Sequence, residues 1–157
     1  MAALTKKYIG KLFCTFFLSM VPVIELRGGI PLGLSLGLTP AESFLCAVVG
    51  NMLPVPFLIL LTRKVFEWLK KSAKIAPLIE KLEQRGHEKG DLVRRYKTLG
   101  LLILVAVPLP GTGAWTGALV ATLLEMELKT AIPAIGLGVL IAGGLVLAAS
   151  MGLIAIF

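Results

Sequence analysis

ELRGGIP, residues 25–31, places an acid and a base between two long apolar stretches of the chain. A charge at the centre of a membrane helix costs about 2.5–3.5 kcal/mol on insertion scales, so such residues mark a functional site by default. The paired glycines and the proline disfavour a continuous helix. Non-helical backbone at membrane depth is stable only where protein or a watered cavity satisfies it, as in transporter sites. We therefore predict a helix break at residues 24–31.

The composition is that of an integral membrane protein. Of the 157 residues, 57% are hydrophobic and only 16% are charged, and the mean hydropathy is +0.91. Soluble domains have about half apolar and about a quarter charged residues. The chain carries 16 basic residues, and most of them lie in residues 63–97 between apolar blocks. This distribution is typical of a cytoplasmic loop and not of a nucleic-acid-binding face.

Catalytic and metal-binding patterns are missing from the sequence. The cysteines, Cys14 and Cys46, lie in separate apolar stretches and form neither a CxxC motif nor a Cys/His cluster, so we interpret both as packing residues. The one histidine, His87, lies in a polar loop. The sequence contains no Ser/His/Asp set and no phosphate-cradling P-loop. We therefore expect neither an enzyme nor a bound cofactor or metal.

The N-terminal segment is short for a membrane span. A basic lead, residues 1–11, precedes the apolar residues 12–24. Lys11 interrupts the hydrophobic region and no small-residue cleavage site follows, so the segment is predicted to be mature structure and not a signal peptide. A span needs about 20 residues. Residues 12–24 therefore either enter the membrane partway and turn back, or span it by recruiting the chain from Tyr8 onward.

The chain after the predicted break contains a return segment and a spanning helix. Residues 32–38 are too few to span alone and fit a returning half-helix. Thr39-Pro40-Ala41-Glu42 then has the pattern of a capping box with proline at the first helical position. It opens a predicted spanning helix, residues 41–61, with Asn51, Pro54 and Pro56 in its interior. These residues indicate a kink satisfied by neighbouring helices, or alternatively an Asn51 that faces the break.

Residues 62–97 form a distinct basic segment. Their apolar residues recur at helical spacing with lysines on the other faces, which predicts an amphipathic helix that bends or restarts at Pro77. Such helices lie in the lipid headgroup layer and are attracted to anionic lipids. The excess of basic residues places this segment in the cytoplasm.

The second half repeats the order of the first. Residues 99–107 form an apolar stretch, a Pro/Gly-rich break covers residues 108–117, a return segment reaches Leu124, and a spanning helix covers about 131–157. Because one cytoplasmic segment joins the halves, the fold class is an all-α membrane protein with an inverted repeat of re-entrant hairpin plus spanning helix. The lysines before residue 12 favour a cytoplasmic N-terminus instead, so its side stays open.

The stretch MVPVIELRGGIPLGLSLGLTP, residues 20–40, resembles the signature of a family of small multidrug export proteins from bacteria and archaea. The resemblance covers nearly the whole chain and implies a protein of the prokaryotic cytoplasmic membrane. The family in turn resembles the DedA or VTT-domain superfamily, whose two re-entrant hairpins carry a membrane-embedded acid and arginine. That superfamily is linked to moving lipid-carrier phosphates or lipids between leaflets.

VPLPGTGAWTGALVA, residues 107–121, is similar to the DedA hairpin pattern with PLPG. DedA sequences usually place an acid just after PLPG. Here Thr112 follows Gly111, and the acid, Glu25, accompanies Arg27 on the other hairpin. The likeness therefore supports the architecture better than it supports the substrate.

The chemistry of Glu25 and Arg27 follows from the residue types. In an extended break their side chains would point to one side and converge on a ligand or on each other. An arginine fork binds phosphate or carboxylate bidentately, and half-helix N-termini favour anions. Burial disfavours a charged carboxylate, so Glu25 could exchange protons near neutral pH. A third possibility is a Glu25–Arg27 salt bridge that only locks the break.

These arguments predict a proton-coupled carrier or flippase of an anionic, phosphate-bearing amphiphile. An exporter of hydrophobic cations and a non-transporting scaffold are the alternatives. Membrane lipids, a small amphiphile and a second copy of the chain are the predicted partners, with residues 137–144 as a candidate dimer face or an internal packing face. Glu25 is the predicted proton carrier, and the predicted substrate-binding residues are Glu25, Arg27, Gly28, Gly29, Pro31, Asn51, Pro110, Gly111, Thr112, Gly113 and Trp115.

Overall fold

The computed structural model describes residues 2–70, 90–109 and 111–156. Within these ranges the regular structure is entirely α-helical, as the composition predicted. The helices are α1 (Ala2–Met20), α2 (Glu25–Ser35), α3 (Pro40–Met52), α4 (Pro54–Lys70), α6 (Gly90–Ala106), α7 (Ala114–Leu123) and α8 (Leu128–Ile156).

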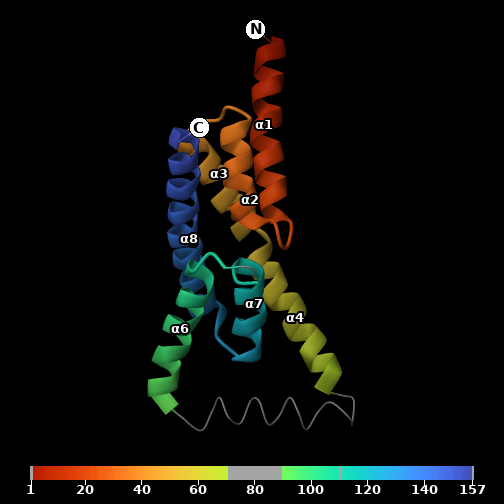
Figure 1. Ribbon diagram of the computed structural model, residues 1–157. Helices are drawn as coiled ribbons and strands as arrows, with labels where there is room; N and C mark the ends of the chain where they lie inside the picture. The colour runs from red at the N-terminus through yellow and green to blue at the C-terminus, as the bar shows by residue number, and fades with distance from the viewer. Residues whose placement is uncertain (1, 71–89, 110, 157) are drawn as a thin grey trace.

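The helices form two hairpins that meet halfway along the molecule. The hairpin of α1 and α2 reaches the middle from one end, and the hairpin of α6 and α7 reaches it from the opposite end (Figure 1). Beside them run α3 with α4, and α8, which extend past the meeting point. Pro40–Trp68 and Leu128–Gly152 are long and apolar enough to cross a membrane, each with a mean hydropathy of 2.3. Together with the composition, these two helices indicate a membrane protein.

The first break differs from the predicted one. The irregular backbone lies at residues 21–24, and α2 begins at Glu25 and continues through Pro31, so the predicted break at 24–31 is mostly helix. Pro31 removes only one backbone donor, that of its own nitrogen. Gly29 serves helix packing, because a β-carbon there would overlap the hydroxyl of Ser19 on α1. The argument that Glu25 and Arg27 share one side of an extended strand is therefore wrong.

Both return helices end in the same hydrogen-bonded turn. After α2, Leu38 N–H donates to Gly33 O at 3.0 Å, and after α7, Met126 N–H donates to Ala121 O at 2.9 Å. The residue before each donor has a positive φ, 80° at Gly37 and 51° at Glu125. This is the Schellman pattern that satisfies the last carbonyls of a helix. In both halves, therefore, the return helix ends in the same type of turn, which agrees with the order of parts predicted from the sequence.

The predicted start of the long first-half helix is confirmed. Thr39 Oγ1 accepts from Glu42 N–H at 3.3 Å, and Thr39 N–H donates to the Glu42 carboxylate at 2.8 Å, which completes the capping box. The helix continues beyond the predicted residue 61, through Lys70, with an interruption at Leu53 just before Pro54. A proline removes the donor that would continue the ladder, which accounts for the break at this position.

The second-half elements also shift at their ends. The irregular backbone covers residues 107–109 and 111–113, and the last four residues of the predicted 108–117 break belong to α7. The long C-terminal helix begins at Leu128, three residues before the predicted start. In the predicted amphipathic segment, α4 reaches Lys70 and α6 begins at Gly90. The predicted bend at Pro77 and the loop with His87 lie outside the described residues.

Glycines bring the incoming helices close to the long helices in both halves. A β-carbon at Gly50 of α3 would overlap the carbonyl oxygen of Phe16 on α1. At Gly138 of α8, a β-carbon would lie 2.9 Å from the carbonyl oxygen of Leu102 on α6. Residues 137–144 were predicted to be either a dimer face or an internal packing face. Part of this face packs inside the protomer, as the second interpretation states.

The buried core lies around the meeting point of the hairpins. Leu26 and Ile30 of α2 and Ala114 and Ala118 of α7 belong to one cluster with Ile135 of α8, and each is at most 2% exposed. Small residues on α7 allow close helix contacts, because a β-carbon at Gly117 would lie 2.6 Å from Val105 of α6 and 3.4 Å from Ile135 of α8. The charged residues at the start of α2 are thereby fixed next to the start of α7.

Candidate functional site

The carboxylate of Glu25 lies at the N-terminus of α7. Its side chain is 4% exposed, and Oε1 accepts a hydrogen bond from the backbone N–H of Trp115 at 3.3 Å. The other oxygen, Oε2, lies against Gly113, where a β-carbon would overlap it. The first N–H groups of a helix have no partner within the helix and carry partial positive charge. Glu25 therefore occupies the position in which a helix N-terminus binds an anion.

The guanidinium of Arg27 lies at the opposite side of the second break. Nη1 donates to the carbonyl oxygen of Leu109, and Nη2 donates to Thr112 Oγ1 at 2.7 Å and to the carbonyl oxygen of Val107 at 3.4 Å. These carbonyls directly follow the end of α6 at Ala106. A cation is favoured at a helix C-terminus, and hydrogen bonds from a charged donor are strong. Arg27 therefore stabilises the end of α6 together with the loop.

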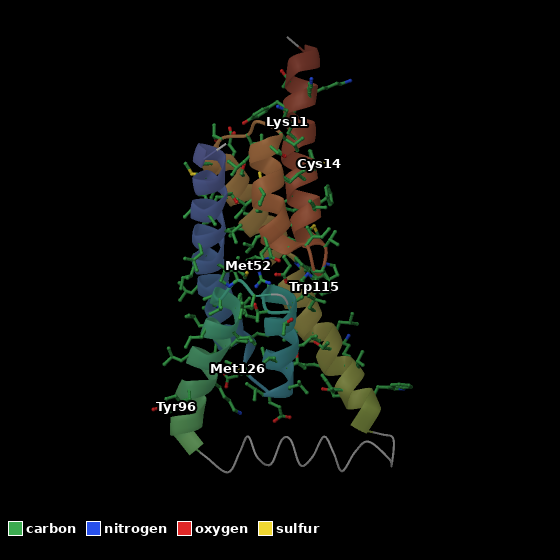
Figure 2. The ribbon with its side chains drawn as sticks, in the orientation of Figure 1. Lys11, Cys14, Met52, Tyr96, Trp115 and Met126 are labelled. Atoms are coloured by element: carbon green, nitrogen blue, oxygen red, sulfur yellow. The ribbon has the colours of Figure 1, made fainter. Side chains whose placement is uncertain are left out.

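Trp115 links the same two breaks in the reverse direction. Its indole Nε1 donates to the carbonyl oxygen of Met20, the last residue of α1, at 3.2 Å. Trp115 lies near the middle of the molecule, at about the level of Met52 (Figure 2). A buried indole N–H normally finds such an acceptor. The contact joins the start of α7 to the end of α1.

Glu25 and Arg27 each contact the second half of the chain. In the described part of the chain their side-chain hydrogen bonds go to Val107, Leu109, Thr112 and Trp115, and no ion pair joins the two side chains. The hypothesis that they only lock the first break by pairing with each other is not supported by this geometry. Their positions instead couple the two breaks across the middle of the protein.

Asn51 lies at the level of this site and has no hydrogen-bond partner. It is 0% exposed, and neither its amide nitrogen nor its amide oxygen is satisfied. On the facing helices, a β-carbon at Gly33 of α2 would lie 2.6 Å from Ser43 Oγ of α3. The two helices run in opposite directions with equal rise per residue, so Asn51, eight residues further along α3, lies at the same level along the helix axes as Glu25, eight residues back along α2. The predicted orientation of Asn51 toward the break stays a prediction.

The remaining predicted residues serve structure or lie elsewhere. A β-carbon at Gly28 would overlap the side chain of Ile24, and Gly29 packs on Ser19, so both glycines allow close contacts within the first hairpin. Pro31 is exposed within α2. Gly111 is exposed in the loop and has a φ of 81°, which favours glycine. Pro110 lies outside the described residues.

Several groups that contribute to the site were not predicted. The carbonyl oxygens of Met20, Val107 and Leu109 accept the hydrogen bonds of Trp115 and Arg27. Backbone acceptors leave no residue-type signal in a sequence. The one available signal was positional, because each carbonyl lies at or just beyond the end of a helix, where carbonyl groups lack partners.

Basic side chains cap the far end of α7. Lys97 Nζ donates to the carbonyl oxygen of Leu124 at 3.1 Å, and Arg63 Nη2 donates to the carbonyl oxygen of Met126. Cations are favoured at a helix C-terminus. The sequence analysis assigned both residues only to the basic segment, whereas the structure also gives them a role in holding α7.

Comparison with known families identifies the family of this chain. The model of the family described as "Putative small multi-drug export protein" matches residues 25–145, which is more than half of the chain. The chain belongs to this family. The match begins at Glu25, just after the first break, and includes the second break and most of α8. No curated protein and no solved structure matched the chain.

The family of small multi-drug export proteins agrees with the membrane character of the chain and indicates a transport role. The resemblance to that family, stated from residues 20–40, is confirmed by the match. Nothing in the comparison extends to the DedA superfamily, and this likeness stays a prediction.

The Glu25 carboxylate contacts Gly113 and the N–H of Trp115, and we call this position at the N-terminus of α7 its seat. Gly113→Ala is expected to disrupt the seat. Gly113 has a φ of 127°, which L side chains rarely adopt, and a β-carbon there would overlap both carboxylate oxygens of Glu25. Left-handed backbone at a non-glycine residue costs about 1–3 kcal/mol. We expect a lower unfolding temperature in mild detergent. Gly111→Ala, with a φ of 81° but no atom within 4 Å of the added carbon, is the control that separates backbone strain from loss of the seat. Equal effects of the two substitutions would contradict the prediction.

Proposed function

We propose that this protein is a proton-coupled membrane transporter of an anionic, phosphate-bearing lipid or amphiphile. The observation that carries the proposal is the pair of charged side chains, Glu25 and Arg27, at the point where the two hairpins meet. Ionisable residues at membrane depth are expensive and are a functional hypothesis by default. Their placement midway between the ends of the molecule suits a substrate site that is reached from either side.

The architecture supports transport by alternating access. In the proposal, Pro40–Trp68 and Leu128–Gly152 span the membrane, and the two hairpins are re-entrant from opposite faces. The matched turns after α2 and α7 support an inverted repeat. Inverted repeats with broken helices build many secondary transporters, in which one repeat rocks against the other around a central site. The end with Arg63 and Lys97 is proposed to face the cytoplasm of a prokaryotic cell, because positive residues collect there.

The charge distribution supports an anionic substrate. The N-terminus of α7 and the guanidinium of Arg27 are positive groups on the two sides of the second break. Such groups bind phosphate or carboxylate oxygens. A site for cations alone would not need Arg27.

The surroundings of the site support an amphiphile. Val23 is 95% exposed, and the neighbouring loop residues Val21, Val107 and Leu109 are also exposed. In a membrane protein such an apolar rim faces lipid tails. A molecule with a charged head and an apolar tail would place the head near Arg27 while its tail stays in the lipid.

Export of hydrophobic cations is the second candidate, and the family description favours it. In that case the buried carboxylate of Glu25 is the binding charge. A protein that binds neither class of ligand would be a non-transporting scaffold. The two transport candidates differ in their dependence on Arg27.

Ligand-dependent thermal stability of the purified protein tests the proposal. A ligand that binds only the folded state stabilises it, by about 2.7 kcal/mol when the ligand concentration is a hundred times Kd. The unfolding temperature rises as a result. We expect stabilisation by lipid phosphates in the wild type and its loss in Arg27→Ala. Stabilisation by tetraphenylphosphonium that survives Arg27→Ala but not Glu25→Gln would favour cation export. A lack of response to both ligands in every variant would favour the scaffold.

A further inference from the structure

The anion position at the N-terminus of α7 is already filled by a side chain of the protein itself. Glu25 lies on α2, in the other hairpin, and its carboxylate is 4% exposed against Gly113 and the N–H of Trp115. A carboxylate that is 90 residues away in sequence thus takes the place that a substrate anion would take.

We propose that the anionic group of the substrate and the Glu25 carboxylate bind to the same seat at the N-terminus of α7, so that the substrate anion binds there together with a proton on Glu25. This inference rests on the proposed function and adds a mechanism for its proton coupling. The substrate class is a tetrahedral oxyanion, either a lipid phosphate headgroup or a free phosphate-like ion.

Two anions cannot share this seat at full charge. The N-terminus of a helix corresponds to roughly half a positive charge, and two anions within a few ångströms repel each other strongly. The only cation near the break with described contacts is Arg27, whose guanidinium is directed to carbonyl oxygens and to Thr112. The substrate anion therefore displaces the carboxylate, and the displaced group takes up a proton to leave the low-dielectric site uncharged.

Asn51 is suited to receive the displaced Glu25. It is fully buried at the level of Glu25, and both polar atoms of its amide lack a partner. A buried amide without partners costs about 1–3 kcal/mol, so a polar group that reaches Asn51 gains a hydrogen bond there. A protonated Glu25 has one O–H donor and the Asn51 amide oxygen is a free acceptor. The remaining N–H₂ group of Asn51 is available to the substrate anion.

The charge of the site is conserved in this exchange. With the seat filled by Glu25, one carboxylate balances one guanidinium. With the substrate bound, one substrate anion balances the same guanidinium, and the proton resides on a carboxyl oxygen of Glu25. No covalent bond other than the O–H bond changes. Because the net charge is the same in both states, the site can move between the two faces of the membrane with similar electrostatic cost.

The pH dependence of anion binding tests this inference. The probe is a short-chain phosphatidylglycerol, whose single charge is constant from about pH 5 to about pH 8, and phosphatidylcholine of the same chain length is the neutral control. Inorganic sulfate distinguishes a free oxyanion from a lipid headgroup. Binding is measured by titration calorimetry in mild detergent on wild type, Glu25→Gln and Glu67→Gln. Glu67 is an exposed acid on α4 and serves as the matched control.

In the wild type and in Glu67→Gln, we expect affinity for phosphatidylglycerol to fall by up to about tenfold per pH unit above the titration of Glu25, as one-proton linkage requires. In Glu25→Gln the affinity is expected to be independent of pH and higher than in the wild type at pH 8. Calorimetry of the wild type in buffers of different ionisation enthalpy is expected to give about one proton taken up per anion bound. This measurement uses only the wild-type protein and so does not depend on whether a variant folds.

The outcomes separate the inference from the proposed function. If phosphatidylglycerol binds with the same pH slope in Glu25→Gln, or without proton uptake in the wild type, the shared seat is overturned and the proposed anionic substrate stands. If phosphatidylglycerol and sulfate bind to no variant at any pH, both are overturned. Binding of sulfate with the expected pH slope supports the seat and assigns it to a free oxyanion, whereas binding of the lipid alone assigns it to a headgroup.

Discussion

Arg27→Ala is expected to loosen the contact between the two hairpins and to lower the stability of the protein. The side chain donates to Leu109 O, Val107 O and Thr112 Oγ1, all in the second break. Hydrogen bonds to a charged group contribute about 1.5–3 kcal/mol, and the freed carbonyls have no water to bind in a membrane interior. We expect a free energy of unfolding that is lower by about 2–3 kcal/mol when measured by denaturant titration in detergent micelles.

Two further variants distinguish the effect of the hydrogen-bond geometry of the Arg27 guanidinium from the effect of its charge. Lysine keeps the charge but has no planar set of donors, so Arg27→Lys is expected to recover only part of the loss. A double-mutant cycle with Thr112→Val measures the coupling between Arg27 and the hydroxyl that accepts its bond at 2.7 Å. Full recovery by lysine together with a coupling energy near zero would show that the hydrogen-bond geometry has no role and only the charge matters.

Gly50→Ala is expected to be among the most disruptive single-methyl changes in the chain. The added carbon would overlap the backbone carbonyl of Phe16, which cannot move without separating α1 from α3. Overpacking costs about 1–3 kcal/mol and occasionally more, which exceeds the gain of about 1 kcal/mol that alanine brings to a helix. We expect a clear decrease in the unfolding temperature.

Gly100→Ala is the control for this prediction. Gly100 lies in the interior of α6, and a β-carbon there meets no atom within 4 Å. Only the gain in helix propensity applies, so its unfolding temperature should be unchanged or higher. A destabilisation of Gly100→Ala as large as that of Gly50→Ala would mean that the contact with Phe16 is not the cause.

The position of the first break shows where reasoning from residue types failed. The glycines and proline of ELRGGIP predicted non-helical backbone, yet α2 contains all of them. Helix propensity is a weak preference that packing overrides. Here the missing side chain of Gly29 allows α2 to approach α1 at Ser19, and the close packing holds the segment helical. The break lies upstream, at residues 21–24.

The candidate site was predicted in its residues but not in its pairings. Glu25, Arg27, Thr112, Gly113 and Trp115 were chosen for their charge, their polarity or their place in a break, and the structure brings them together. Their partners are backbone groups and side chains of the other half. Such contacts depend on how the hairpins meet, which no local pattern specifies.

By itself the sequence determined the membrane character of the protein, the start of the long helix at Thr39 and the repeated order of its parts. These features follow from composition, capping chemistry and hydrophobic length, which act over a few residues or over the whole chain. The tertiary structure alone decided that Glu25 fills the N-terminus of α7 and that Arg27 holds the end of α6. Each of these contacts joins residues more than 80 positions apart. Only the packing of the two hairpins against the long helices brings them within hydrogen-bonding distance.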